Sequence, residues 1–127
     1  MANVINWFEI PAKDFNRACS FYENVLDGTV QKIPASEGMP VDMGFLPGYD
    51  QTSGDVGGAV VTGEGYEPSS TGSIIYLNGG DDLAVPLNRV EGSGGQVLVP
   101  KTSIGENGFF AQFIDTEGNR VALHSMG

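Results

Sequence analysis

Basic residues are scarce in this chain. Six lysines and arginines stand against sixteen acidic residues, and the formal net charge at pH 7 is −10. Proteins that bind nucleic acids neutralise phosphates with lysine and arginine, so this composition excludes a nucleic-acid partner. An anionic membrane surface would repel the chain for the same reason, and we expect no membrane partner.

Cysteine and long apolar runs are also nearly absent. Cys19 is the single cysteine, which excludes an internal disulfide and is typical of a reducing compartment. No stretch approaches the roughly 20 apolar residues that cross a bilayer. The first residues lack the basic start and apolar core of a secretory signal. We therefore expect a cytoplasmic protein.

The chain contains an internal repeat. Glycine, in contrast to lysine, arginine and cysteine, is abundant in it. The segments WFEIPAKDFNRACSFYENVLDGTV and IIYLNGGDDLAVPLNRVEGSGGQVL both read as strand, turn, helix, glycine and strand. Aligning Asp14 with Asp82 places Trp7 on Ile75, and Gly28 on Gly95 after a slip of one residue. Further extended runs follow each helix. The pattern predicts an α+β fold in which paired βαβββ modules form a curved mixed sheet.

The chain length predicts a single domain over residues 1–127. We expect module one over about residues 1–62, a Gly/Ser/Pro-rich joint over about 62–73, and module two over about 74–127. Helices are expected over 14–26 and 82–93, outside the sheet, each beginning beside an aspartate that can cap it.

The first helix carries an apolar stripe that includes Cys19. Phe15, Ala18, Cys19 and Tyr22 follow the spacing of one buried helix face. A reactive thiolate would need partial exposure and a basic neighbour. The spacing favours a structural role for Cys19 over a nucleophilic one.

Strand alternation predicts which residues face the helices and which face away. The uniformly apolar set is expected under the helices: Phe8, Ile10, Ile74, Tyr76, Val121 and Leu123. The opposite face would carry Trp7, Glu9, Ile75, Leu77, Arg120, Ala122 and His124. This mixture of aromatic, aliphatic and few polar groups is typical of a small-molecule pocket, whereas a purely structural sheet would expose more Lys, Thr and Ser.

Two segments resemble a known family. FEIPAKDFNRACSFYENVL is similar to the opening of the vicinal oxygen chelate (VOC) superfamily, which includes glyoxalase I, extradiol dioxygenases and bleomycin-resistance proteins. GGQVLVPKTSIGENGFFAQFIDTEGNRVAL resembles the closing segment of its small glyoxalase-like members. The turn D-x-E-G-N-R, from Asp115 to Arg120, is the most specific piece. The resemblance covers nearly the whole chain and is least clear over residues 34–56.

The resemblance implies four metal-ligand positions, on the first and last strands of each module. They fall on Trp7, on Gly57 or Gly58, on Ile75 and on Ala122. None of these side chains offers the imidazole, carboxylate or thiolate that a divalent cation binds. Glu9 and His124 lie two residues beyond lost positions, but together they would supply too few ligands. We expect no metal and no cofactor.

The residues and the resemblance together support three hypotheses. The first is a metal-free small-molecule-binding protein whose ligand lies in a concave groove lined by Trp7, Glu9, Ile75, Leu77, Ala122 and His124. The second is a glyoxalase-like lyase or isomerase that uses Glu9 or His124 as its proton-transfer group. The third is a folded interaction module with a vestigial pocket. The resemblance also implies a homodimer.

The carboxylate of Glu9 leaves two interpretations open. A carboxylate in a partly apolar groove is costly unless it is paired. Glu9 could pair structurally with Arg120 or with backbone amides, or it could bind the ligand. Beside it, the Trp7 indole would fill the volume of the lost metal and form the floor of the groove.

Overall fold

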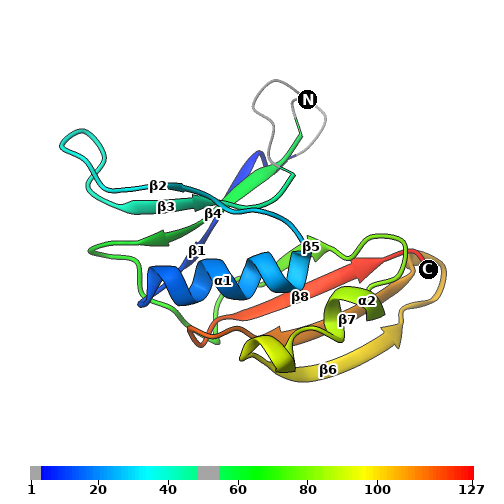
Figure 1. Ribbon diagram of the computed structural model, residues 1–127. Coiled ribbons are helices and arrows are strands. Elements are labelled where there is room, and N and C mark those ends of the chain that lie inside the picture. Colours follow the sequence, from blue (N-terminus) through cyan, green and yellow to red (C-terminus); the bar gives the residue numbers. More distant parts are fainter. Residues whose placement is uncertain (1–3, 49–54) are drawn as a thin grey trace.

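Two four-stranded mixed sheets make up the fold (Figure 1). The structure is a computed structural model that describes residues 4–48 and 55–127. The first sheet has the order β1-β4-β3-β2 and the second the order β5-β8-β7-β6. Their strands are β1 (Trp7–Pro11), β2 (Gln31–Ile33), β3 (Asp42–Phe45), β4 (Gly57–Thr62), β5 (Ile75–Asn78), β6 (Gln96–Ser103), β7 (Phe109–Ile114) and β8 (Arg120–Ser125).

The two sheets share one topology. In each, the first and last strands of the module pair in parallel, and the remaining neighbours pair antiparallel. This repetition confirms the predicted α+β fold of paired βαβββ modules. The predicted curved mixed sheet consists of two hydrogen-bonded sheets, one from each module.

The first helix forms as predicted, and the second is shorter than predicted. α1 (Phe15–Leu26) begins after Asp14, whose side chain accepts a hydrogen bond from the Arg17 amide. The expected helix over 82–93 is wrong in extent: α2 (Ala84–Leu87) is a single turn, followed by the 3-10 turn η1 (Glu91–Ser93). After Leu87 the amides of Arg89 and Val90 donate to carbonyls three residues back, so the α-helical ladder ends there. The 3-10 turn η2 (Gly105–Asn107) precedes β7.

α1 packs against both modules, so they share one hydrophobic core (Figure 1). The Phe21 ring on α1 contacts Phe113 on β7, with centroids 5.8 Å apart. Cys19 is fully buried in the same cluster, and burial raises the pKa of its thiol to about 11. The thiol therefore stays protonated at neutral pH, in agreement with the predicted structural role.

The predicted facing of β5 is wrong by one residue. Leu77 belongs to the core and Ile75 packs against it, whereas Ile74 and Tyr76 are 37% and 52% exposed. Ile75 therefore faces the core, as Phe8 does, and not the side of the sheet that carries Trp7. The alignment was anchored on the helix aspartates, and a shift of one residue exchanges the two faces of a strand.

Within the described part of the chain, no helix combines the length and the apolar character needed to span a membrane.

Candidate functional site

The candidate site lies on the face of the two sheets turned away from α1, called the open face below. On β3, a Cβ atom at Gly44 would lie 2.8 Å from the Cys19 sulfur, so this position faces α1. Its neighbours Met43 and Phe45 therefore face the other way. The same alternation places Trp7 and Glu9 of β1 on the open face, because Ile10 lies in the core.

Glu9 is positioned by two aromatic side chains. The Trp7 indole donates from Nε1 to Glu9 Oε2 at 3.3 Å. Trp7 itself packs edge-on against Phe45, with ring centroids 5.7 Å apart. Tyr66, from the joint between the modules, lies close to Glu9. The negative charge of Glu9 raises the pKa of the Tyr66 phenol, and burial and the hydrogen-bonding interaction with Glu9 raise it further. The half-buried carboxylate thus accepts a hydrogen bond from Trp7 and has the Tyr66 phenol nearby.

Arg120 lies on the open face of module two. Its Nε donates to Gln112 Oε1 at 2.9 Å, and Gln112 is only 8% exposed. Over residues 4–48 and 55–127, the guanidinium of Arg120 makes no ion pair within 4 Å. The structural pairing of Glu9 with Arg120, one of the alternatives left open by the sequence, is therefore not formed.

Glu9 and Arg120 nevertheless line the same cavity, which has a volume of about 260 Å³. We call this cavity the Glu9–Arg120 pocket. It lies between β1 and the strands β5 and β8, and residues 67–73 of the joint border it. Its lining residues are Glu9, Ile10, Pro11, Glu67, Ser69, Thr71, Ser73, Ile75, Asn119, Arg120 and Val121.

His124 is turned to a different place. Its Nε2 lies 2.7 Å from the Asn107 carbonyl, so this nitrogen carries the hydrogen in that bond. His124 lines another cavity, with Tyr76, Asn78 and Asp81, and Glu9 does not contribute to it. The two candidate proton-transfer residues are therefore not brought together. Ala122 is on the open face but is completely buried.

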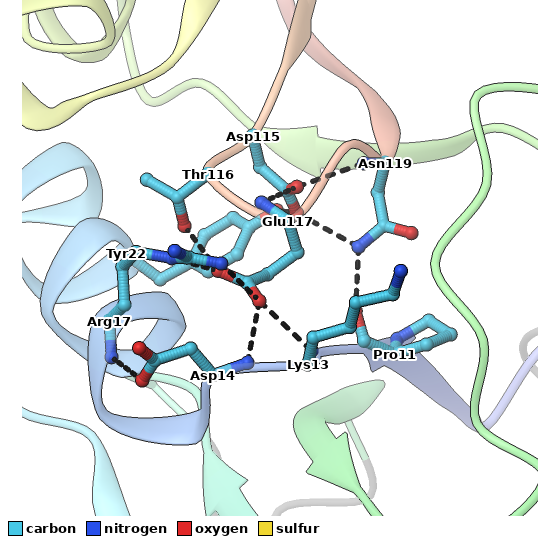
Figure 2. A network of polar contacts seen from close by, with 9 residues as sticks. All are labelled: Pro11, Lys13, Asp14, Arg17, Tyr22, Asp115, Thr116, Glu117 and Asn119. Atoms are coloured by element: carbon cyan, nitrogen blue, oxygen red, sulfur yellow. Dashed lines mark hydrogen bonds and ion pairs between the residues drawn. The ribbon is translucent and has the colours of Figure 1, made fainter.

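The D-x-E-G-N turn joins the two modules (Figure 2). Glu117 accepts hydrogen bonds from the backbone amides of Lys13 and Asp14, at 2.9 and 2.8 Å. It also accepts from the Arg17 guanidinium, with Nε 2.7 Å from Oε2, and from the Thr116 hydroxyl. The turn between β7 and β8 thereby holds the start of α1.

Asp115 and Asn119 complete this network, called the turn clasp below. Asp115 accepts a 2.6 Å hydrogen bond from the buried Tyr22 hydroxyl. The Asn119 amide donates to the Pro11 carbonyl at 2.7 Å, and its oxygen accepts from the Ser69 amide. These residues connect α1, β1 and the joint, so the most specific motif of the sequence performs a structural task (Figure 2).

Comparison with known proteins now identifies the family. The family model described as the Glyoxalase/Bleomycin resistance protein/Dioxygenase superfamily matches residues 4–123. The chain belongs to this superfamily. A glyoxylase-like domain-containing protein of Didymella fabae is 31% identical over 125 residues, which covers 94% of this chain and 91% of the relative.

Solved structures agree on the fold at low identity. A mutant of Zea mays glyoxalase I superposes with a TM-score of 0.69 at 18% identity, covering 94% of this chain and 45% of the maize chain. A glyoxalase/bleomycin resistance protein from Albidiferax ferrireducens gives 0.68 at 12% identity, covering 98% and 100%. The fosfomycin resistance protein FosX of Listeria monocytogenes gives 0.63 at 15% identity, covering 98% and 92%.

The metal-ligand positions that the resemblance implies can be located in the structure. Trp7 and Gly57 are register partners, so of the two glycines Gly57 shares the face of Trp7. The corrected facing of β5 moves the third position from Ile75 to Tyr76, the register partner of Ala122, and the fourth stays at Ala122. An indole, a glycine, a phenol and a methyl group lack the imidazole, carboxylate and thiolate donors that a divalent metal binds. Among the described residues, no group of three or more His, Cys, Asp or Glu could hold a metal ion.

Sequence reasoning missed two residues of the open face. Gln112 accepts the hydrogen bond from Arg120. It lies on β7 between the core residues Ala111 and Phe113, so strand alternation could have placed it on the open face. Tyr66 lies in the Gly/Ser/Pro-rich joint, where no periodicity indicates which side chain turns toward the sheet.

Proposed function

We propose that this protein binds a small molecule on its open face without a metal ion. The observation that carries the proposal is the hydrogen bond from Trp7 to Glu9. Trp7 occupies a position that the superfamily uses for a metal ligand, and here its indole orients a carboxylate beside a cavity. The indole and the Phe45 ring offer a flat apolar surface, and the Glu9–Arg120 pocket adds polar groups.

Of the predicted ligand-binding residues, we propose that Trp7, Glu9 and Ile75 contact the ligand, because Ile75 packs on the core but also lines the Glu9–Arg120 pocket. Leu77 belongs to the core, and Ala122 is buried. His124 lines a separate cavity toward the other end of β8, so we leave it out of the proposed site. We add Arg120 and Tyr66 to the proposed site.

A second candidate function is proton transfer by Glu9, as in a glyoxalase-like lyase or isomerase. The specific observation that favours it is the Tyr66 phenol beside the carboxylate. A carboxylate acting as base needs a substrate proton within hydrogen-bond reach, and a neighbouring hydroxyl can stabilise the charge that develops. A Glu9→Gln variant that binds ligand but converts none would favour this candidate.

We also propose a homodimer, in the cytoplasm. Superfamily members are often dimeric and bind small molecules. Several large apolar side chains around β1, β4 and β5 are exposed in the single chain, and a second copy would cover them: Val4, Ile5, Val56, Ile74 and Tyr76. Light scattering at micromolar concentration should give the mass of two chains, and the mass of one chain would contradict this.

Trp7 is the only tryptophan, so its fluorescence reports directly on the proposed site. A small-molecule screen is expected to find compounds that both change Trp7 emission and raise the melting temperature. Glu9→Gln should change stability by less than about 1 kcal/mol, because Glu9 forms no ion pair within the described residues. The same substitution should weaken binding of the compounds found at least tenfold.

A charge-matched control is Glu106→Gln, on the exposed turn η2. It should leave both stability and binding unchanged. If Glu9→Gln unfolds the protein, or if confirmed ligands never perturb Trp7 emission, the open face is not the binding site.

A further inference from the structure

The Glu9–Arg120 pocket combines charges of both signs in a small volume. Its lining has one guanidinium, from Arg120, and two carboxylates, from Glu9 and the exposed Glu67. None of these carboxylates forms an ion pair with Arg120 within the described ranges. The pocket therefore presents separate positive and negative groups that a ligand could engage individually.

Arg120 is prepared to bind a carboxylate. Its Nε is occupied by Gln112 Oε1, which fixes the plane of the guanidinium. The described residues offer no competing carboxylate within 4 Å. A planar guanidinium held in this way binds carboxylates with directional hydrogen bonds. Gln112, which accepts from this guanidinium, is itself buried from solvent.

A simple anion does not satisfy the pocket. The two carboxylates in the lining would repel it. The electrostatic potential of the whole chain, with its net charge of −10, would also repel an anion. A simple cation would in turn meet Arg120. A ligand that carries an acidic group and an ammonium group complements both ends.

The volume limits the size of such a ligand. The cavity volume of about 260 Å³ lies below the roughly 300–1,000 Å³ of pockets that hold drug-sized ligands. This matches a free amino acid of small or medium size. Ser69, Thr71 and Ser73 also line the pocket, where the Ser69 and Thr71 hydroxyls hydrogen-bond to each other.

We propose that the ligand class of this site is a small zwitterion, an amino acid or a compound with the same pair of groups. Its carboxylate binds Arg120, and its ammonium group binds Glu9 with Glu67 at the rim. This inference rests on the proposed function, since it names the ligand of the same open face.

The test is calorimetric titration of the purified full-length chain with the proteinogenic L-amino acids. Each one that binds is compared with its decarboxylated amine and its deaminated acid. We expect at least one amino acid to bind, and both truncated compounds to bind at least tenfold more weakly. Arg120→Gln should weaken binding of the amino acid at least tenfold and remove its advantage over the amine.

Lys32→Gln is the matched control, because Lys32 is an exposed cation on β2 and its loss changes the net charge equally. It should leave the affinity for the amino acid unchanged. The comparison of the three compounds on the unaltered protein does not depend on how well any variant folds.

Two results would overturn the inference: no amino acid binding with a Kd below about 10 mM, or equal affinity for an amino acid and either truncated form. If other compounds from the Trp7 fluorescence screen bind while amino acids do not, the proposed function stands and the zwitterion inference fails. If neither amino acids nor any screened compound binds, both fail.

Discussion

Replacing Glu117 with alanine is expected to lower the free energy of unfolding by about 3–5 kcal/mol. The carboxylate is fully buried and accepts hydrogen bonds from two backbone amides at the start of α1, from Arg17 and from Thr116. Removing it leaves the Lys13 and Asp14 amides without their acceptor and frees the helix start from the β7–β8 turn. Urea unfolding followed by circular dichroism measures the loss.

The control for this substitution is Glu106→Ala, which removes an exposed carboxylate from the turn η2 at the other end of β7. It should change stability by less than about 0.5 kcal/mol. Equal effects of the two substitutions would show that the turn clasp contributes no more than surface charge.

Glu117 also predicts how stability depends on pH. Burial alone would raise the pKa of this carboxyl group, but hydrogen bonds from Arg17, Asp14, Thr116 and Lys13 lower it to about 2. Since the folded pKa lies below the ordinary 4.5, the contribution of Glu117 is complete above about pH 4.5 and is lost as the pH falls toward about 2. The stability difference between the unaltered protein and Glu117→Gln should therefore shrink over that range. A constant difference would contradict the assignment.

Asp115→Ala should have the second large effect, about 4 kcal/mol. Asp115 is 4% exposed and accepts from the Tyr22 hydroxyl, from the backbone amides of Glu117 and Asn119, and from the Asn119 side chain. Burial and the charge of Asp115 raise the pKa of Tyr22 well above its ordinary value, so Tyr22 remains a neutral donor. Alanine would leave this buried hydroxyl and the donors of the turn without their acceptor.

Tyr22→Phe separates one bond of this network from the rest. It removes only the 2.6 Å hydrogen bond, and Asp115 keeps its other donors, so the expected loss is about 1.5–3 kcal/mol. Thermal or urea unfolding of the two variants should rank Asp115→Ala as the more damaging. The opposite ranking would show that the turn tolerates the loss of its central acceptor.

The fold could be predicted because each module repeats the same local signals. Asp14 before an apolar helical stripe predicted α1, and Asp14 is indeed its cap. The second helix was overextended because the apolar spacing continues past Leu87, while the amides of Arg89 and Val90 donate to carbonyls only three residues back and the α-helical ladder ends. Local patterns thus located the elements better than they located their ends.

The candidate site could be predicted only in part. Which face of the sheet a side chain lies on depends on where its strand is placed, to within one residue. Trp7 and Glu9 were placed on the correct face because their strand was read from its own alternation. Ile75 and Leu77 were not, because β5 was placed by alignment with another segment, and a shift of one residue reverses a strand. The contacts of Glu117 and Tyr66 connect distant segments and left no local signal.

The central claim is that the open face binds its ligand without a metal ion. The most direct measurement is a titration that follows Trp7 fluorescence for a compound found in the screen, on protein treated with a chelator and on protein supplemented with zinc, manganese or nickel. The account predicts the same affinity in all samples, with the affinity reduced at least tenfold by Glu9→Gln. Binding that disappears with the chelator and returns with one metal would contradict it.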